Sequence, residues 1–103
     1  MKFLIRWTPI ETKKIEGLQM FATVDMEQMQ GHMANMGIET EVSYHLTDQS
    51  GFSVVSANNI QTVTQFCLLW SGTNNIQVDP IMTDEEMQAA AKGTLAMMAE
   101  MGG

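Results

Sequence analysis

The sequence is poor in cysteine, in basic residues and in long apolar runs. Cys67 is the single cysteine among 103 residues, so an internal disulfide is excluded. A free cysteine usually behaves as a small buried hydrophobe, and we predict a packing role for it. No run approaches the roughly 20 apolar residues of a transmembrane helix, and the N-terminal Met-Lys-Phe-Leu-Ile-Arg-Trp is not typical of a signal peptide. We therefore expect a protein of the reducing cytoplasm.

Basic side chains are outnumbered, with 5 Lys and Arg against 12 Asp and Glu and a formal net charge of −7. Such a chain repels both the phosphates of nucleic acids and an anionic lipid surface. The sequence also contains neither a phosphate-binding glycine loop nor a cysteine-pair zinc pattern. We predict no nucleic-acid partner, no membrane partner, no metal and no cofactor.

Four segments alternate between apolar and polar residues, which is typical of half-buried strands. They cover residues 2–8, 38–46, 52–57 and 76–82. In the second segment, strict alternation predicts two faces, one with Ile38, Thr40, Val42, Tyr44 and Leu46 and the other with Glu39, Glu41, Ser43 and His45. Pro80 in the fourth segment lacks a backbone donor, which favours an edge strand.

The intervening segments have apolar residues at helical spacing. A first helix is expected to open at Glu11 or Thr12, with a second helical piece over residues 25–36 that ends at Gly37. Asn58 or Asn59 is expected to cap a third helix, and Thr83 to cap a last helix that runs to about Met98 and frays through residue 103.

This order, β-α-β-β-α-β-α, predicts one α+β domain over residues 1–103 with a ferredoxin-like βαββαβ fold and an extra C-terminal helix. The four strands form one antiparallel sheet with the helices on one face. The other face would carry Leu4, Val55 and Ile81, and we expect two copies to pair through it as a dimeric α/β barrel.

Short motifs in fixed order support a family resemblance. They are Met-Lys-Phe-Leu-Ile-Arg-Trp-Thr at the start, the pair Tyr44-His45, the run Leu68-Leu69-Trp70 and the segment 78–86, Val-Asp-Pro-Ile-Met-Thr-Asp-Glu-Glu. Over residues 1–90 the chain resembles a bacterial family of small proteins of unknown function in the dimeric α/β-barrel superfamily. The resemblance implies a ferredoxin-like protomer and a homodimer, but no activity.

Arg6, His45 and Asp79 are candidate catalytic residues, because strict alternation places them on the polar faces of three strands. Together they would bind an anionic or enolisable substrate and move a proton, as in a cofactor-independent monooxygenase or isomerase. The simpler interpretation is a structural ion-paired cluster without chemistry.

Methionine occurs 11 times, and four methionines form a helical stripe within residues 26–36. A flexible apolar lining for a fatty-acid-like or aromatic ligand is one interpretation, and the filling of core gaps is the simpler one. Copper(I) binding by thioethers has no supporting cysteine or histidine cluster. The candidate ligand-binding residues are Trp7, Phe21, Met26, Met29, Met33, Met36, Tyr44 and Trp70. A structural or regulatory dimer without ligand is the remaining alternative.

Overall fold

The computed structural model describes residues 1–102, and its element order follows the expected alternation. The elements are β1 (Lys2–Pro9), the 3₁₀ turn η1 (Glu11–Lys13), α1 (Lys14–Thr23), α2 (Met26–Asn35), β2 (Glu39–His45), β3 (Gly51–Ser56), α3 (Ile60–Leu68), β4 (Asn74–Ile81) and α4 (Asp84–Met101). The separate helical piece α2 and the extra C-terminal helix α4 are both confirmed. The expected fraying at Gly103 falls outside the described residues.

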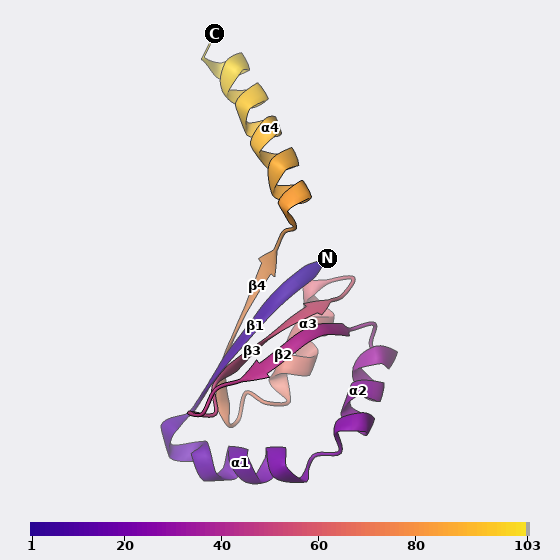
Figure 1. Ribbon diagram of the computed structural model, residues 1–103, viewed down its shortest axis with the longest axis vertical. Coiled ribbons are helices and arrows are strands. Elements are labelled where there is room, and N and C mark those ends of the chain that lie inside the picture. The colour runs from indigo at the N-terminus through magenta and orange to yellow at the C-terminus, as the bar shows by residue number, and fades with distance from the viewer. Residues whose placement is uncertain (103) are drawn as a thin grey trace.

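One four-stranded sheet organises the fold, in the order β2-β3-β1-β4 with every neighbouring pair antiparallel. This confirms the α+β, ferredoxin-like arrangement. The helices α1, α2 and α3 lie beside one face of the sheet, whereas α4 points away from the body (Figure 1). No helix among residues 1–102 lies on the other face of the sheet, and we call this face the open face.

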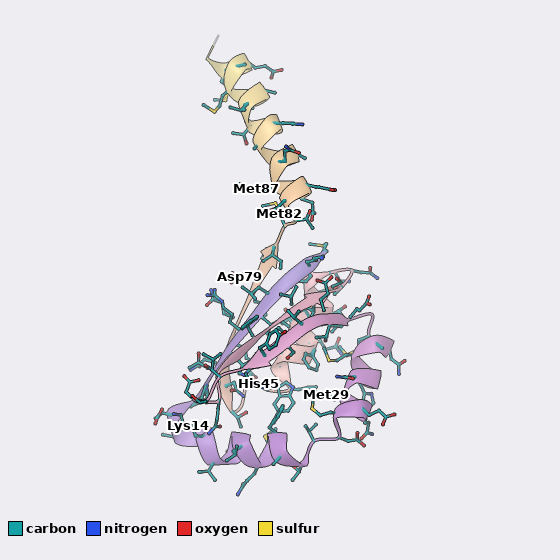
Figure 2. All side chains as sticks on the ribbon, viewed as in Figure 1. Lys14, Met29, His45, Asp79, Met82 and Met87 are labelled. Carbon is teal, nitrogen blue, oxygen red and sulfur yellow. The ribbon has the colours of Figure 1, made fainter. Side chains whose placement is uncertain are left out.

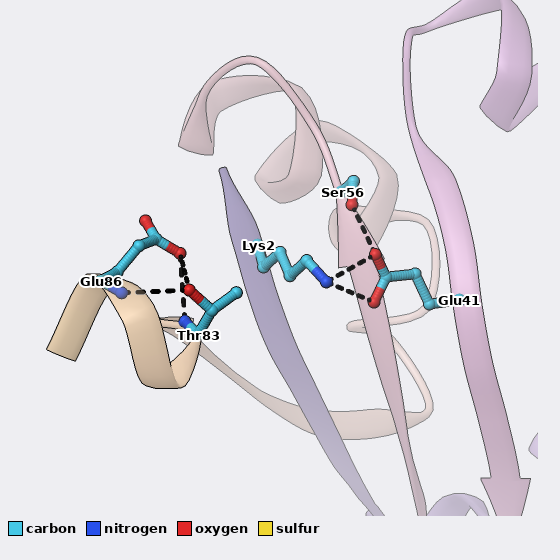
Figure 3. Close-up of polar contacts among 5 residues, drawn as sticks. All are labelled: Lys2, Glu41, Ser56, Thr83 and Glu86. Carbon is cyan, nitrogen blue, oxygen red and sulfur yellow. Dashed lines mark hydrogen bonds and ion pairs between the residues drawn. The ribbon is translucent and has the colours of Figure 1, made fainter. Parts of the chain in front are cut away.

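Local chemistry accounts for most of the boundaries. The Asn59 side chain caps α3 by accepting a 2.9 Å hydrogen bond from the Thr62 backbone N–H. Thr83 and Glu86 form the reciprocal hydrogen bonds of a capping box at the start of α4 (Figure 3). Gly37 has a φ of +79°, as a C′ residue requires. Pro80 lies in the edge strand β4, as predicted.

The core is small and lies between the sheet and the helices. It comprises Phe3, Ile5, Met33, Ile38, Val55, Ala57, Val63 and Cys67, all of them buried. The burial of Cys67 agrees with its predicted packing role. By contrast, α1 has no buried residue, and Ile15 and Leu18 on that helix are exposed. Since α1 stands off from the sheet, space remains between the two.

A β-bulge in β2 corrects the expected alternation of that strand. The pairing of β2 with β3 shifts between Thr40 and Val42, so one extra residue is inserted and the later side chains exchange faces. Val42 and Tyr44 therefore lie on the open face, and Ser43 and His45 face the helices. The expected alternation was wrong beyond Glu41, because hydrophobic patterning carries no signal for a bulge.

A second correction concerns Val55, which was expected on the open face. It pairs with the core residue Phe3 and is itself fully buried. Its neighbour Val54 pairs with Leu4 instead, so the open face carries Leu4, Val54 and Ile81. The run Val54-Val55 looks equally apolar in both positions, and only the register decides which valine is inside.

Candidate functional site

A partly enclosed cavity of about 350 Å³ lies between the sheet and the helices α1, α2 and α3. The strands β1, β2 and β3 contribute alternate residues to its wall, because the side chains of a strand point in turn to its two faces. Its wall includes Ile5, Trp7, Leu18, Phe21, Met26, Met29, Met33, Ser43, His45, Ser53, Val55, Phe66, Cys67 and Trp70.

Three aromatic rings form one end of this cavity. The His45 imidazole lies between the Trp7 indole, at a centroid distance of 5.3 Å, and the Phe21 ring, at 5.0 Å. Trp7 and His45 are both paired in register with Gly51 of β3. A Cβ at position 51 would lie 2.8 Å from Cε2 of Trp7. The glycine therefore leaves the space that the indole occupies beside His45.

Methionines of α2 supply the flexible part of the wall. Met26, Met29 and Met33 line the cavity. Figure 2 shows Met29 on α2 and His45 on β2, the two sides of this wall. Met33 is also part of the buried core. Unbranched thioether side chains adapt to irregular shapes, so this wall can adjust to molecules of different outline.

The polar groups of the wall are neutral or weakly basic. Ser53 donates a 2.9 Å hydrogen bond to Ser43 from the neighbouring strand, and Gln30, Gln49 and Asn74 lie elsewhere in the wall. Within residues 1–102, no Lys, Arg, Asp or Glu side chain lines the cavity. Its electrostatics therefore suit a molecule without a formal charge, or one whose single polar end meets His45.

Cys67 also lines the cavity, but its environment suppresses nucleophilic chemistry. Burial raises the pKa of its thiol from the ordinary 9.0 to about 11. The thiolate is the reactive form, so a thiol with this pKa is inert near neutral pH.

Residues 1–95 match the protein family described as Domain of unknown function (DUF3303). The chain belongs to the DUF3303 family. The match includes β1 to β4, and with them all the elements that contribute to the cavity wall. The expectation of a family of unknown function is confirmed. No curated protein matches the chain.

In this DUF3303 protein the three candidate catalytic residues are not brought together. Arg6 and Asp79 form an ion pair on the open face, with 2.9 Å between Nη2 and Oδ2. His45 faces the helices instead, because the bulge in β2 reverses its orientation, and Figure 2 labels His45 and Asp79 at separate places. The expected convergence around one concave space is therefore wrong, and this geometry gives no support to proton transfer shared by these residues.

Six of the eight candidate ligand-binding residues line the cavity, namely Trp7, Phe21, Met26, Met29, Met33 and Trp70. Tyr44 lies on the open face and is 61% exposed, with its ring 5.8 Å from that of Phe52. Met36 packs against the core from outside the cavity wall. Sequence reasoning missed His45, Ser43 and Ser53 as wall residues, because the bulge in β2 and the register that places Ser53 on the inner face with Val55 have no signal in the sequence.

Residues 1–102 contain neither a membrane-spanning helix nor a cluster of metal-binding side chains. No helix in this part of the chain is long and apolar enough to cross a membrane. In the same residues, no cluster of three or more His, Cys, Asp and Glu side chains could hold a metal ion. A shallower depression follows the outer surface of α3 between Asn59 and Leu68, and residues of that helix and its cap form its whole wall.

Proposed function

We propose that this DUF3303 protein binds a small apolar or amphipathic molecule in the cavity beside the sheet. The observation that carries the proposal is an apolar space of about 350 Å³ with few polar groups and no formally charged wall residue among those described. Ligand sites typically measure 300–1,000 Å³ and combine an apolar wall with a few directed polar groups. The volume here is at the lower end of that range.

The wall also indicates how such a molecule would lie. The aromatic end formed by Trp7, His45 and Phe21 suits a flat ring or an unsaturated segment. The methionines of α2 suit an aliphatic part of variable shape. The imidazole of His45 and the hydroxyl of Ser43 are the groups available for one hydroxyl, carbonyl or carboxyl group of the ligand.

The decisive experiment is titration with the neutral fluorescent probe N-phenyl-1-naphthylamine, followed through quenching of tryptophan fluorescence. Met29→Trp should fill the cavity and weaken probe binding by about tenfold or more, because steric exclusion removes the apolar contacts. Met20→Trp is the matched control, since Met20 lies on α1 outside the cavity wall. Equal affinities for both variants, or no binding to the wild-type protein, would contradict the proposal.

Native mass spectrometry of the purified protein provides an independent test. We expect a bound small organic molecule that is released on denaturation, and Met29→Trp should lower its occupancy. Failure of the wild-type protein to carry any such molecule, together with the absence of probe binding, would favour a structural or regulatory dimer without ligand.

The open face supports a homodimer as the second part of this proposal. Its apolar side chains Leu4, Val42, Phe52, Val54 and Ile81 form a continuous set over the four strands. A sheet face of this composition gains free energy when it is removed from water. Two copies related by a two-fold axis would bury the same face twice. Light scattering of the wild-type protein and of Phe52→Glu tests this, because the charge should dissociate the dimer.

A further inference from the structure

The helix α4 has an apolar stripe that is not covered by any other part of residues 1–102. Every residue from Met82 to Met101 is exposed, and the helix extends away from the sheet (Figure 1). An 18-residue helix is about 27 Å long. Most helices in proteins are stabilised by packing of an apolar face rather than by intrinsic propensity. A helix left in water along its whole length lacks that stabilisation.

The side chains of α4 are segregated between two sides. Residues at spacings of three and four form one apolar stripe, consisting of Met87, Ala90, Ala91, Thr94, Leu95, Met98 and Met101. The opposite side carries the polar residues Glu85, Gln88, Lys92 and Glu100 together with Ala89, Gly93 and Ala96, and Met97 lies at the border. The large apolar side chains are therefore gathered on one side, which is the side available to a protein partner.

The exposed area of the chain is larger than that of a compact monomer, which also indicates a partner. The surface measures 7488 Å², whereas a compact folded monomer of this mass exposes about 5,800 Å². The radius of gyration is 17.6 Å, against about 13 Å for a compact domain of this length. The excess of about 1,700 Å² is roughly twice what each partner contributes to a standard interface.

The connection between β4 and α4 keeps the helix away from its own sheet. Only Met82 and Thr83 lie between the two elements. Thr83 is fixed by the capping box with Glu86, so the first turn of the helix continues directly from the strand. The helix runs on beyond the strand and does not fold back over the sheet (Figure 1), and short hinges favour exchange of the element between copies.

We propose that α4 is an exchanged arm whose apolar stripe packs on a second copy of this chain. The inference deepens the proposed homodimer and rests on it. The second copy is the occupant that matches the observations, because the proposed two-fold dimer supplies a second body beside the sheet, and each copy would receive the other's helix in the same way while the sheet faces pair. A lipid surface is a poor match, since the arm carries Asp84, Glu85, Glu86 and Glu100 against the single cation Lys92.

The first test compares two charge insertions on opposite sides of α4 by light scattering across a dilution series. Met98→Glu places a carboxylate in the apolar stripe and should weaken dimerisation by about tenfold or more. Ala96→Glu adds the same charge to the opposite side and should leave dimerisation unchanged. Equal dimerisation of the two variants would overturn the exchanged arm. Circular dichroism of the sheet should be the same for both, because α4 contributes nothing to the core.

Phe52→Glu on the open face separates this inference from the homodimer proposal. If Phe52→Glu dissociates the dimer and Met98→Glu does not, the arm is overturned and the sheet-face dimer stands. If Met98→Glu dissociates it and Phe52→Glu does not, the arm is supported and the sheet-face dimer fails. A wild-type monomer overturns both.

The second test asks which copy the arm contacts. An equal mixture of copies labelled with ¹⁴N and ¹⁵N, subjected to unfolding and refolding, is treated with a lysine cross-linker. We expect cross-links of mixed isotopic mass that join Lys92 of one copy to Lys2, Lys13 or Lys14 of the other. Cross-links from Lys92 exclusively within single-label molecules would show that α4 folds onto its own body, and would overturn the exchange.

Discussion

The side chains of Arg6 and Asp79 are joined across the neighbouring strands β1 and β4, with 2.9 Å between Nη2 and Oδ2. The pair belongs to the open face, where both side chains retain about half of their exposure, at 51% and 43%. Solvent screens such a pair, so its contribution to stability is small in the isolated protomer. Its position nevertheless places two opposite charges on the face that we propose for dimerisation.

We predict a coupling energy of about 0.2–1 kcal/mol between Arg6 and Asp79 in the monomeric state. The measurement is a double-mutant cycle with Arg6→Gln and Asp79→Asn, from urea unfolding of the Val42→Glu protein. This charge on the open face of β2 should dissociate the proposed dimer, and it lies two strands away from Arg6. In the wild-type background the coupling should be larger, because an apposed sheet face would exclude water from the pair. A coupling that is the same in both backgrounds would contradict burial of this pair in a dimer.

The fold could be predicted from the sequence because its signals are local. Alternation marks the strands, and the side chains of Asn59 and Thr83 mark two helix starts. The candidate site depended instead on the face to which each side chain of β2 points. The bulge at Glu41 reversed that face, which moved His45 into the cavity and Tyr44 out of it. A one-residue shift exchanges both sets of side chains, and neither composition nor periodicity reports it.

Glu41, the residue at the bulge, is held by interactions that make acid stability a second prediction. Its carboxylate accepts hydrogen bonds from the Lys2 ammonium at 3.1 Å and from the Ser56 hydroxyl at 3.0 Å (Figure 3). These contacts lower the pKa of Glu41 below its ordinary value of 4.5, and the hydrogen bond from Lys2 has the largest effect. The folded state therefore binds the proton less readily than the unfolded state does.

The direction in which stability changes with pH follows from this difference in proton binding. Glu41 stabilises the fold fully above pH 4.5, and its contribution is lost as the pH falls through the lower folded pKa. Glu41→Gln should therefore flatten the decline of unfolding free energy below pH 4.5, as measured by urea unfolding at several pH values. Glu39→Gln removes the same charge from the same strand and should retain the decline. Parallel curves for wild type and Glu41→Gln would contradict this role.

A third prediction uses two glycines with opposite surroundings. Gly51→Ala should destabilise the protein and displace Trp7, because the new Cβ would overlap the indole and the Tyr44 carbonyl oxygen. Gly31→Ala should stabilise α2 by about 0.5–1 kcal/mol, since a Cβ there meets nothing within 4 Å. Thermal unfolding and near-ultraviolet circular dichroism measure both effects. A Gly51→Ala protein with unchanged tryptophan signal and stability would contradict the packing described for Trp7.

The last prediction concerns the thiol of Cys67, whose pKa is raised by burial to about 11. A thiol with this pKa has about 100-fold less thiolate at pH 8 than one with the ordinary value, and alkylation by iodoacetamide should be slower by at least that factor. The folded state holds the proton more tightly than the unfolded state. Its contribution to stability is therefore complete below pH 9.0 and is lost as the pH rises towards 11.

Cys67→Ala should remove the decline of the unfolding free energy above pH 9, which urea unfolding at pH 8 to 11 would show. The decline of the unfolding free energy at acid pH should be unchanged. Because Cys67 lines the cavity, the same thiol also reports on occupancy. Saturation with N-phenyl-1-naphthylamine should slow alkylation of the wild-type protein further, since the probe would exclude water and reagent from the wall. In Met29→Trp the probe should have no such effect. Protection of the thiol that is equal in both proteins would mean that the probe does not occupy the space beside Met29.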